Sequence, residues 1–287
     1  IILIIAAVIA MCAHRLRQPL IIAYIVTGIL VGSSLFGLSA SSELFEVLSK
    51  IGVAFLLFTV GLGLNWRSVK DVGGIALATG VGQVLFCSVV GFFIGLALQF
   101  DPLTSLYLGV AFSFSSTIII VKLLMDKEDL DSLYGRISVG FLLVQDFIAM
   151  LLLLTLSSIG TGMTLERVLI MTLLKAAVLV PAFWVVSAKI LPRVLGYVAK
   201  SQELLFVFSV AWCFLVASIL VKAGFGIEVG ALIAGITLSG SVYYREINAR
   251  IRPLRDFFLI IFFIVLGTRL GFDGLREILV PMLVFSL

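Results

Sequence analysis

Apolar residues in this chain come in long, nearly unbroken runs that short polar stretches separate. Eleven such runs cover roughly residues 1–14, 19–36, 43–64, 72–100, 103–125, 134–160, 165–191, 202–223, 228–244, 254–271 and 275–287. Most of them approach or exceed the about 20 residues with which an α-helix crosses a bilayer. Residues 72–100 and 102–121 contain no charged side chain. The pattern therefore predicts an all-α polytopic membrane protein.

The two ends of the chain indicate a fragment of a longer protein. The first run begins at Ile1, with neither a basic stretch before it nor a small-residue cleavage site after it. We therefore expect a truncated membrane helix and not a signal peptide. The last run is short because the chain stops at residue 287.

Composition excludes the soluble classes. The chain is 62% apolar and 13% charged, too little charge to cover the surface of a soluble domain of 287 residues. Its net charge is +4, but the basic residues lie between apolar runs, so we expect them to flank a membrane and not to bind nucleic acid. The cysteines Cys12, Cys87 and Cys213 all lie within apolar runs, which predicts buried thiols. We expect no disulfide, no cofactor and no resident metal ion.

Lys and Arg are distributed unequally between the two sides of the predicted bundle. The loops that follow odd-numbered helices, together with the helix ends beside them, hold 14 of these residues. The loops and helix ends on the opposite side hold 6. The positive-inside rule places the richer side in the cytoplasm. The chain then begins outside, and every second loop faces the cell interior.

Two pairs of segments resemble each other at nearly one offset. Residues 57–64 (LFTVGLGL) align with 263–270 (FIVLGTRL) at offset 206, and residues 23–29 (AYIVTGI) align with 230–236 (GALIAGI) at offset 207. The offset spans seven helices, an odd number, so the paired helices would cross in opposite directions. An inverted-topology repeat of this kind is common in secondary transporters. We predict a first repeat at 1–160, a linker helix at 161–200 and an incomplete second repeat at 201–287.

Asp146 is the strongest candidate for chemistry. It lies in the middle of the run 134–160 and is the one ionisable residue between Arg136 and Glu166. A charged Asp at the bilayer centre costs about 2.5–3.5 kcal/mol, while keeping an Asp protonated at neutral pH costs about 4 kcal/mol. These energies are comparable, so the side chain can hold either a proton or a cation. A structural Asp that pairs inside the bundle is the alternative.

A cluster of hydroxyl residues interrupts the run 103–125. Ser113, Ser115, Ser116 and Thr117 follow one another closely, and such side chains offer the backbone competing hydrogen bonds. The cluster predicts a discontinuous helix whose free carbonyl groups and helix ends face an ion. An ordinary helix with small residues at a packing interface remains the alternative.

Two further polar residues are weaker candidates. Gln145 precedes Asp146 and could coordinate a cation through its amide oxygen, or face a neighbouring helix. Glu228 begins the run 228–244, where an acid interacts favourably with the helix N-terminus. We list Glu228 and Ser113 as secondary candidates.

The chain resembles the second branch of the monovalent cation:proton antiporters, and within it the Kef-type potassium efflux transporters. The resemblance covers the whole chain in order, and the matches at 143–149 and 262–267 are the most specific. The matching segments are 23–32 (AYIVTGILVG), 55–62 (FLLFTVGL), 114–117 (FSST), 143–149 (LVQDFIA), 230–235 (GALIAG) and 262–267 (FFIVLG).

The resemblance implies a thirteen-helix fold with inverted repeats. Helices 1–3 and 8–10 would form a dimerising scaffold, and helices 4–6 with 11–13 a mobile core. Asp146 matches the essential ion- and proton-binding carboxylate, and residues 115–117 match the unwound stretch of the first broken helix. The implied setting is a prokaryotic inner membrane. A nucleotide-binding regulatory domain often follows the membrane part in such proteins.

The resemblance also has departures. Gln145 stands where sodium-type relatives carry Asn or Asp, which favours K⁺ over Na⁺. Ser33 stands where relatives often have Pro. The expected activity is exchange of K⁺ or Na⁺ for H⁺, with homodimerisation and no enzymatic reaction. A channel-like potassium efflux pathway, or a membrane sensor or scaffold that does not transport, remains an alternative.

Overall fold

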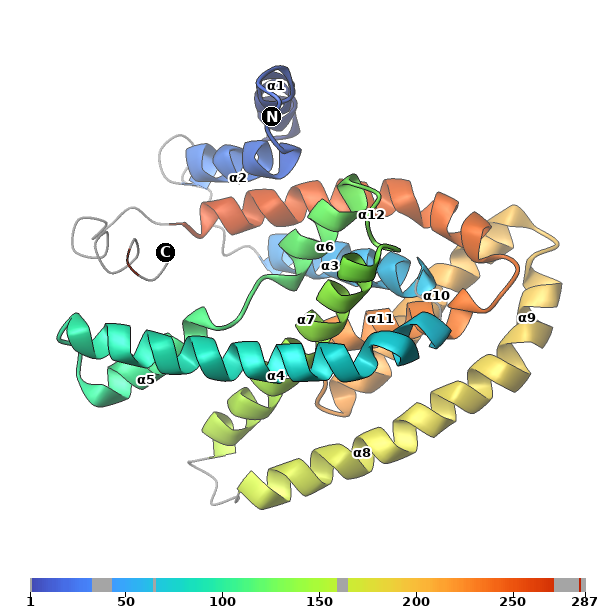
Figure 1. The fold of residues 1–287 in the computed structure, drawn as a ribbon. Coiled ribbons are helices and arrows are strands. Elements are labelled where there is room, and N and C mark those ends of the chain that lie inside the picture. Colours follow the sequence, from blue (N-terminus) through green and yellow to red (C-terminus); the bar gives the residue numbers. More distant parts are fainter. Residues whose placement is uncertain (1, 33–42, 64–65, 159–164, 271–283, 285–287) are drawn as a thin grey trace.

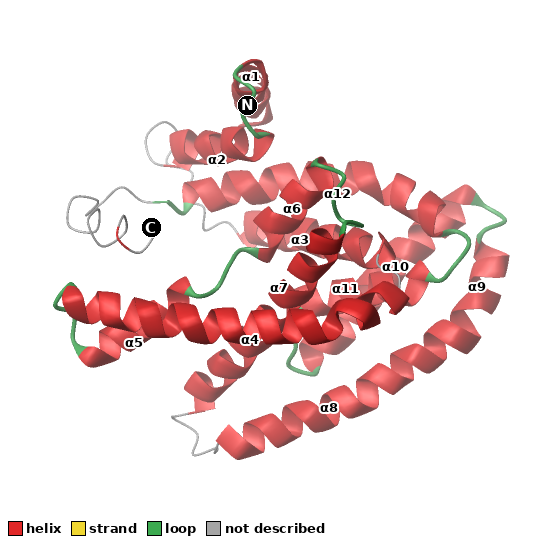
Figure 2. Cartoon of the chain, viewed as in Figure 1, coloured by secondary structure: helices red, strands yellow, loops and turns green. Residues whose placement is uncertain are grey.

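The computed structural model describes residues 2–32, 43–63, 66–158, 165–270 and 284 of the chain. All regular elements within these residues are helices (Figure 2). In chain order they are α1 (Ile2–Arg15), α2 (Leu20–Leu30), α3 (Glu43–Gly63), α4 (Trp66–Ala97), α5 (Pro102–Phe112), α6 (Thr117–Asp126), α7 (Leu133–Ser158), α8 (Leu165–Val185), α9 (Leu191–Val198), α10 (Gln202–Lys222), α11 (Ile227–Ser239) and α12 (Tyr244–Thr268). A π-helical turn, Val186–Ile190, joins α8 to α9.

Six segments of the described chain are long and apolar enough to cross a membrane. They are Glu43–Gly63, Val72–Ala97, Pro102–Asp126, Leu133–Leu152, Ile170–Val198 and Gln202–Lys222. The protein is therefore an integral, multi-pass membrane protein, as the hydropathy pattern predicts. The last predicted run, 275–287, lies outside the described residues except for position 284.

The helices pack in two groups. In the first, α3 packs against α11 and α12, α2 packs against α12 and α1, and α10 packs against α11. In the second, α4 packs against α5 and α7, and α6 packs against α7. Figure 1 shows α4 crossing α7 on the near side, α8 running along the lower edge of the bundle and α9 at its right edge. These groups contain the helices that the resemblance assigns to a scaffold and a core.

Glycine residues allow the helices of the first group to pack closely against one another. Gly28 of α2 faces Gly267 of α12, and a Cβ atom on Gly28 would lie 2.8 Å from the Gly267 Cα. Gly61 of α3 faces Gly235 of α11, and a Cβ atom on Gly235 would lie 2.8 Å from the Gly61 Cα. Small residues let membrane helices approach to backbone contact. Both contacts therefore depend on the missing side chains.

The two glycine pairs are also related by the predicted repeat. Offset 207 carries Gly28 onto Gly235, and offset 206 carries Gly61 onto Gly267, so the repeat exchanges one pair for the other. A two-fold relation between two halves of a bundle produces such an exchange. The contacts support the repeat hypothesis. The opposite directions of the paired helices in the membrane stay a prediction.

One helix boundary differs clearly from the sequence expectation. α12 begins at Tyr244, ten residues before the expected start at 254. Residues 244–252 are too polar for a membrane run, but they form helix with ion pairs one turn apart. Glu246 pairs with Arg250 at 3.7 Å, and Arg252 lies 4.0 Å from Asp256. Pairs at this spacing support an exposed helix.

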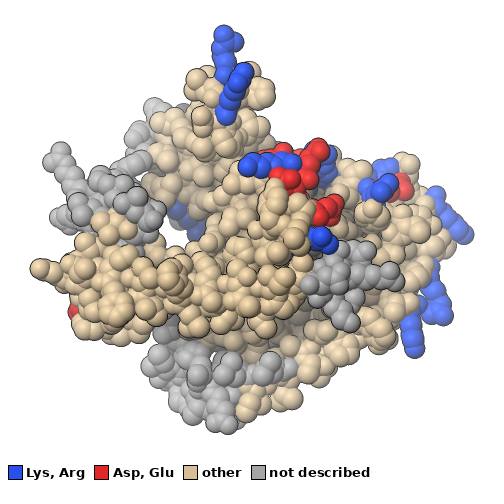
Figure 3. Space-filling model, viewed as in Figure 1, with Lys and Arg blue, Asp and Glu red and all other residues tan. Residues whose placement is uncertain are grey.

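Charged residues gather on one side of the molecule. Figure 3 shows Lys and Arg along the top and right of this face, over the end of α1, the α6–α7 loop and the region of α9. The left edge, with the α4–α5 turn, shows a small acidic patch and no Lys or Arg among the coloured residues of this view. The spatial pattern agrees with the unequal distribution of basic residues along the sequence.

Arg255 is an exception to the exposed basic residues. The sequence places it among the membrane-flanking charges, but the structure leaves it only 4% exposed. Its Nη1 donates to Thr59 Oγ1 of α3 at 3.2 Å and to Met125 Sδ of α6 at 3.8 Å. Its Nε and Nη2 donate to Asp256 Oδ1 at 3.0 and 2.9 Å. One guanidinium thus joins α12 and α3 of the first group to α6 of the second.

We expect Arg255→Met to lower the stability of the folded protein by about 1.5–3 kcal/mol, because hydrogen bonds to a charged group are lost from a buried position. Thermal unfolding of the detergent-purified protein measures this change. Arg252→Met is the matched control on the same helix, since the Arg252 side chain is 72% exposed. Equal melting temperatures for the two variants would contradict a stabilising role for Arg255.

Candidate ion-binding site

The span from Pro102 to Asp126 is broken in its middle. α5 begins at Pro102, where the Asp101 side chain accepts the Thr104 N–H at 3.0 Å. α5 ends at Phe112, and α6 begins at Thr117, so the residues between them are not helical. The discontinuity lies at the position that the hydroxyl cluster predicts.

The hydroxyl groups bond to the backbone at both ends of the break. Ser113 Oγ turns back to donate to the Val110 carbonyl at 2.7 Å. Ser116 Oγ accepts the Ile119 N–H at 3.4 Å and so caps the start of α6. These side chains provide the local partners that let the backbone leave the helix. Ser115 and Ser116 are exposed, and Ser113 is fully buried.

Asp146 of α7 lies beside this break. Thr117 Oγ1, on the first residue of α6, is 3.2 Å from each carboxylate oxygen of Asp146. One hydroxyl carries one proton, so a single donor is shared between the two oxygens. Asp146 is half-buried and Thr117 is buried. The carboxylate therefore keeps most of its acceptor capacity for a proton or a cation.

A second group of polar atoms meets at the other end of the break. The Ser113 carbonyl accepts from Gln83 Nε2 of α4 at 3.1 Å and from Gln145 Nε2 of α7 at 3.4 Å. Gln145 Nε2 also donates to Gln83 Oε1. Gln145 is 1% exposed, and its Oε1 accepts no hydrogen bond from the residues that the structure describes. Sequence reasoning proposed Gln145 and Ser113 but missed Gln83. The signal available was an amide near the middle of the charge-free run 72–100.

Glu228 approaches the site from the first helix group. It lies in the first turn of α11, half-buried, where its carboxylate is 2.5 Å from the place of a Cβ atom on Gly226. It is near enough to Asp146 for electrostatic repulsion between the two carboxylates. The capping role and a role in the ion path therefore both remain compatible with its position.

The atoms at the break suit a hard monovalent cation. Carboxylate, hydroxyl, amide and backbone oxygens are the ligands that such ions accept, and unwound backbone supplies them at midmembrane depth in transporters. Within the described ranges, no three His, Cys, Asp or Glu side chains stand together as a metal site would need. The same carboxylate can bind H⁺ instead of the cation.

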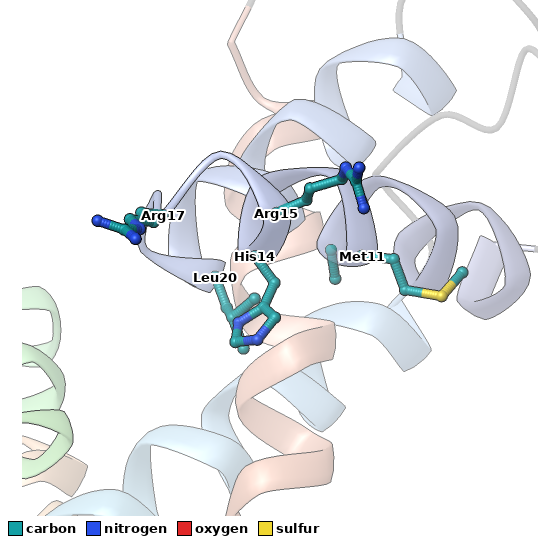
Figure 4. Close-up of a pocket in the computed structure, with 6 residues that line it drawn as sticks. Met11, His14, Arg15, Arg17 and Leu20 are labelled. Carbon is teal, nitrogen blue, oxygen red and sulfur yellow. The ribbon is translucent and has the colours of Figure 1, made fainter.

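A surface hollow of about 920 Å³ lies elsewhere, at the turn between α1 and α2 (Figure 4). Its polar lining comes from His14, Arg15 and Arg17 and its apolar lining includes Met11 and Leu20; Figure 4 shows Leu20 beside the His14 ring and Met11 farther away. The lining contains no carboxylate. Its positive charge would repel a cation, so this hollow is separate from the candidate ion site.

The fold and this site define a helical membrane protein with an intramembrane carboxylate at a broken helix. The whole chain, residues 1–287, matches the family model described as sodium/hydrogen exchanger, transmembrane. The chain belongs to the transmembrane sodium/hydrogen exchanger family.

The names of curated relatives in this family refer to different transported ions. The chain is 28% identical to "Iron transporter MagA" of Paramagnetospirillum magneticum, over 93% of this chain and 63% of the relative. It is 30% identical to "Putative K(+) efflux antiporter KefB" of Alkalimonas amylolytica, over 93% of this chain and 41% of that protein. It is 26% identical to "Na(+)/H(+)-K(+) antiporter GerN" of Bacillus cereus, over 91% of this chain and 68% of that protein. The chain thus spans about half the length of several relatives, such as 48% of "K(+) efflux antiporter 5" of Arabidopsis thaliana.

Proposed function

We propose that the protein to which this chain belongs exchanges a monovalent cation for H⁺ across a membrane, with Asp146 as the shared site. The observation that carries the proposal is the contact of Asp146 with Thr117 at the broken helix. A carboxylate within an apolar span, beside a helix break that brings hydroxyl and backbone oxygens together, has both of the ligand types that exchange requires. Membership of the exchanger family and the antiporter names of several relatives add support.

The exchange follows from competition for one carboxylate. When Asp146 is protonated, it is neutral and has no attraction for a cation. When it is ionised, the cation offsets the cost of a charge in the membrane. A carrier that changes its exposed side only with the site occupied then moves one ion against the other. The hydroxyl of Thr117 and the oxygens of Gln145, Ser115 and Ser116 are the proposed further ligands.

The remaining parts of the proposal concern arrangement and cargo. K⁺ is the favoured cation and Na⁺ the alternative, because Gln145 precedes Asp146 and relatives are named for both ions. The first helix group would act as a dimerising scaffold, and α4–α7 would move as the core. The start of α1 would lie outside a prokaryotic inner membrane. A regulatory domain outside this chain is a further proposal.

A proton-flux measurement in liposomes tests the activity. The full-length parent protein is reconstituted, and K⁺ and Na⁺ gradients are applied separately while the internal pH is followed. Exchange predicts proton movement that is driven by a cation gradient and that stops when the gradient is absent. Cation movement that is independent of protons would instead favour a channel-like efflux pathway. No flux of either ion would favour a sensor or scaffold.

Apparent cation affinity should fall as the pH falls. Protons and the cation compete for one carboxylate, so each unit of acidification below the titration range should raise the apparent KM for the cation about tenfold. The maximal exchange rate at saturating cation should change less than KM. An apparent KM that stays constant over three pH units would contradict a shared site and would favour separate sites for the two ions.

A further inference from the structure

Gln83 of α4 lies at the centre of the polar contact that joins α4, α7 and the helix break. Its Nε2 donates to the Ser113 carbonyl at 3.1 Å, and its Oε1 accepts from Gln145 Nε2. Its Nε2 also lies 3.7 Å from Cys87 Sγ on the next turn of α4. The surrounding span, Val72–Ala97, is otherwise strongly apolar. A half-buried amide in such a span is costly unless it is hydrogen-bonded.

The orientation of both amides follows from the Ser113 carbonyl. A carbonyl oxygen can only accept, so each glutamine must turn its nitrogen toward it. With its nitrogen on Ser113, Gln83 presents its oxygen to Gln145. This oxygen takes a second N–H of Gln145 and holds the Gln145 amide in one orientation. Gln83 thus decides which end of the Gln145 amide is left free.

The end left free is an oxygen. Gln145 Oε1 is buried and accepts no hydrogen bond within the described part of the chain. An unpartnered buried acceptor is unfavourable and calls for a ligand that the protein atoms do not provide. Gln145 and Asp146 both reach the break, one at Ser113 and the other at Thr117. A dehydrated cation at the break would give the Gln145 oxygen its missing partner.

We propose that Gln83 is a positioning residue that sets the cation affinity and the K⁺ to Na⁺ preference of the Asp146 site. It acts through Gln145, by holding the Gln145 amide with its oxygen toward the cation. This inference rests on the proposed exchange function. A purely structural Gln83, which only satisfies the Ser113 carbonyl, would affect stability and leave the ion preference unchanged.

Gln83→Met tests the inference in the full-length protein in liposomes. Methionine keeps the length of the side chain and removes both hydrogen bonds. We expect the KM for the preferred cation to rise about fivefold. The ratio of K⁺ to Na⁺ affinities should shift, and the maximal rate should change by less than about twofold. Thr79→Val is the matched control one turn earlier on α4, because Thr79 is exposed and its hydroxyl donates to the Ile75 carbonyl of its own helix at 2.7 Å.

A double variant separates positioning from a structural role. If Gln83 acts through Gln145, then Gln83→Met combined with Gln145→Met should change KM and ion preference no more than Gln145→Met alone. Effects that multiply in the double variant would overturn the proposal. Should Gln83→Met not fold, Gln83→Asn keeps the amide but withdraws it by one methylene, and it should shift the ion preference in the same direction.

Different results would contradict the role of Gln83 and the proposed exchange function. A folded Gln83 variant with the same KM and ion preference as Thr79→Val would overturn the role of Gln83 and leave the exchange site at Asp146 intact. A wild-type protein that moves no protons in response to any monovalent cation gradient would overturn the proposed function, and the inference about Gln83 with it.

Discussion

Asp146→Asn should abolish cation-driven proton movement in liposomes, to the level of protein-free vesicles. Asparagine keeps the shape of the side chain and its ability to accept from Thr117, which lies 3.2 Å from both carboxylate oxygens. It removes the charge that attracts the cation and the group that binds the proton. Because one side chain is proposed to carry both ions, the loss should be complete for K⁺ and Na⁺ alike. Folding and thermal stability should change little, since the variant removes a buried charge and retains the hydrogen bond.

Two further variants test whether the loss of exchange is specific to Asp146. Gln145→Asn alters a neighbouring ligand without removing titration, so it should change ion preference more than turnover. Glu228→Gln removes the other carboxylate that interacts electrostatically with Asp146. If Asp146→Asn still exchanged ions near the wild-type rate while Glu228→Gln did not, the coupling site would lie at Glu228 and the proposed role of Asp146 would be wrong.

Gly235→Ala should destabilise the protein by more than about 3 kcal/mol, because an added methyl group would overlap the backbone of α3. The new Cβ atom would collide with the Phe58 carbonyl oxygen and lie 2.8 Å from the Cα of Gly61. Backbone cannot move aside as a flexible side chain can. Alanine improves helix propensity by about 1 kcal/mol, which is too little to offset the overlap. Thermal unfolding in detergent, together with the yield of monodisperse protein, measures the effect.

Gly240→Ala provides the control in the same part of the chain. Gly240 follows the last residue of α11 with φ −75°, which alanine adopts freely, and a Cβ atom there would meet none of the described residues within 4 Å. We expect its stability to stay within about 0.5 kcal/mol of wild type. If Gly235→Ala were as stable as Gly240→Ala, α3 and α11 could not be packed through their backbones as the structure has them.

Much of the fold class and part of the site could be predicted from the sequence, because both depend on local signals. Long apolar runs require helices in a bilayer, since every backbone group must be satisfied within the segment. The hydroxyl residues clustered at 113–117 compete for backbone hydrogen bonds, so a few neighbouring residues determine where the helix breaks. Asp146 stands out because an acid is rare and costly at that depth.

Sequence reasoning failed where a local signal was ambiguous. The polar start of α12 gave no hydropathy signal, although its ion pairs and helix-forming residues continue the helix to Tyr244. Gln83 differed from its neighbours only as one amide in an apolar run. The sequence did not indicate whether that amide would face lipid, a neighbouring helix or the break.

The amino-acid sequence by itself determined that this protein crosses a membrane as helices, that one helix is interrupted and that Asp146 lies within the apolar span that follows. Only the tertiary structure decided that Gly28 meets Gly267, that the Arg255 guanidinium is buried against Thr59, and that Gln83 meets Gln145 at the Ser113 carbonyl. The first set follows from hydropathy and local hydrogen bonding, which act within one segment. The second set depends on which faces of distant helices come together, and that is fixed by close packing across the whole bundle.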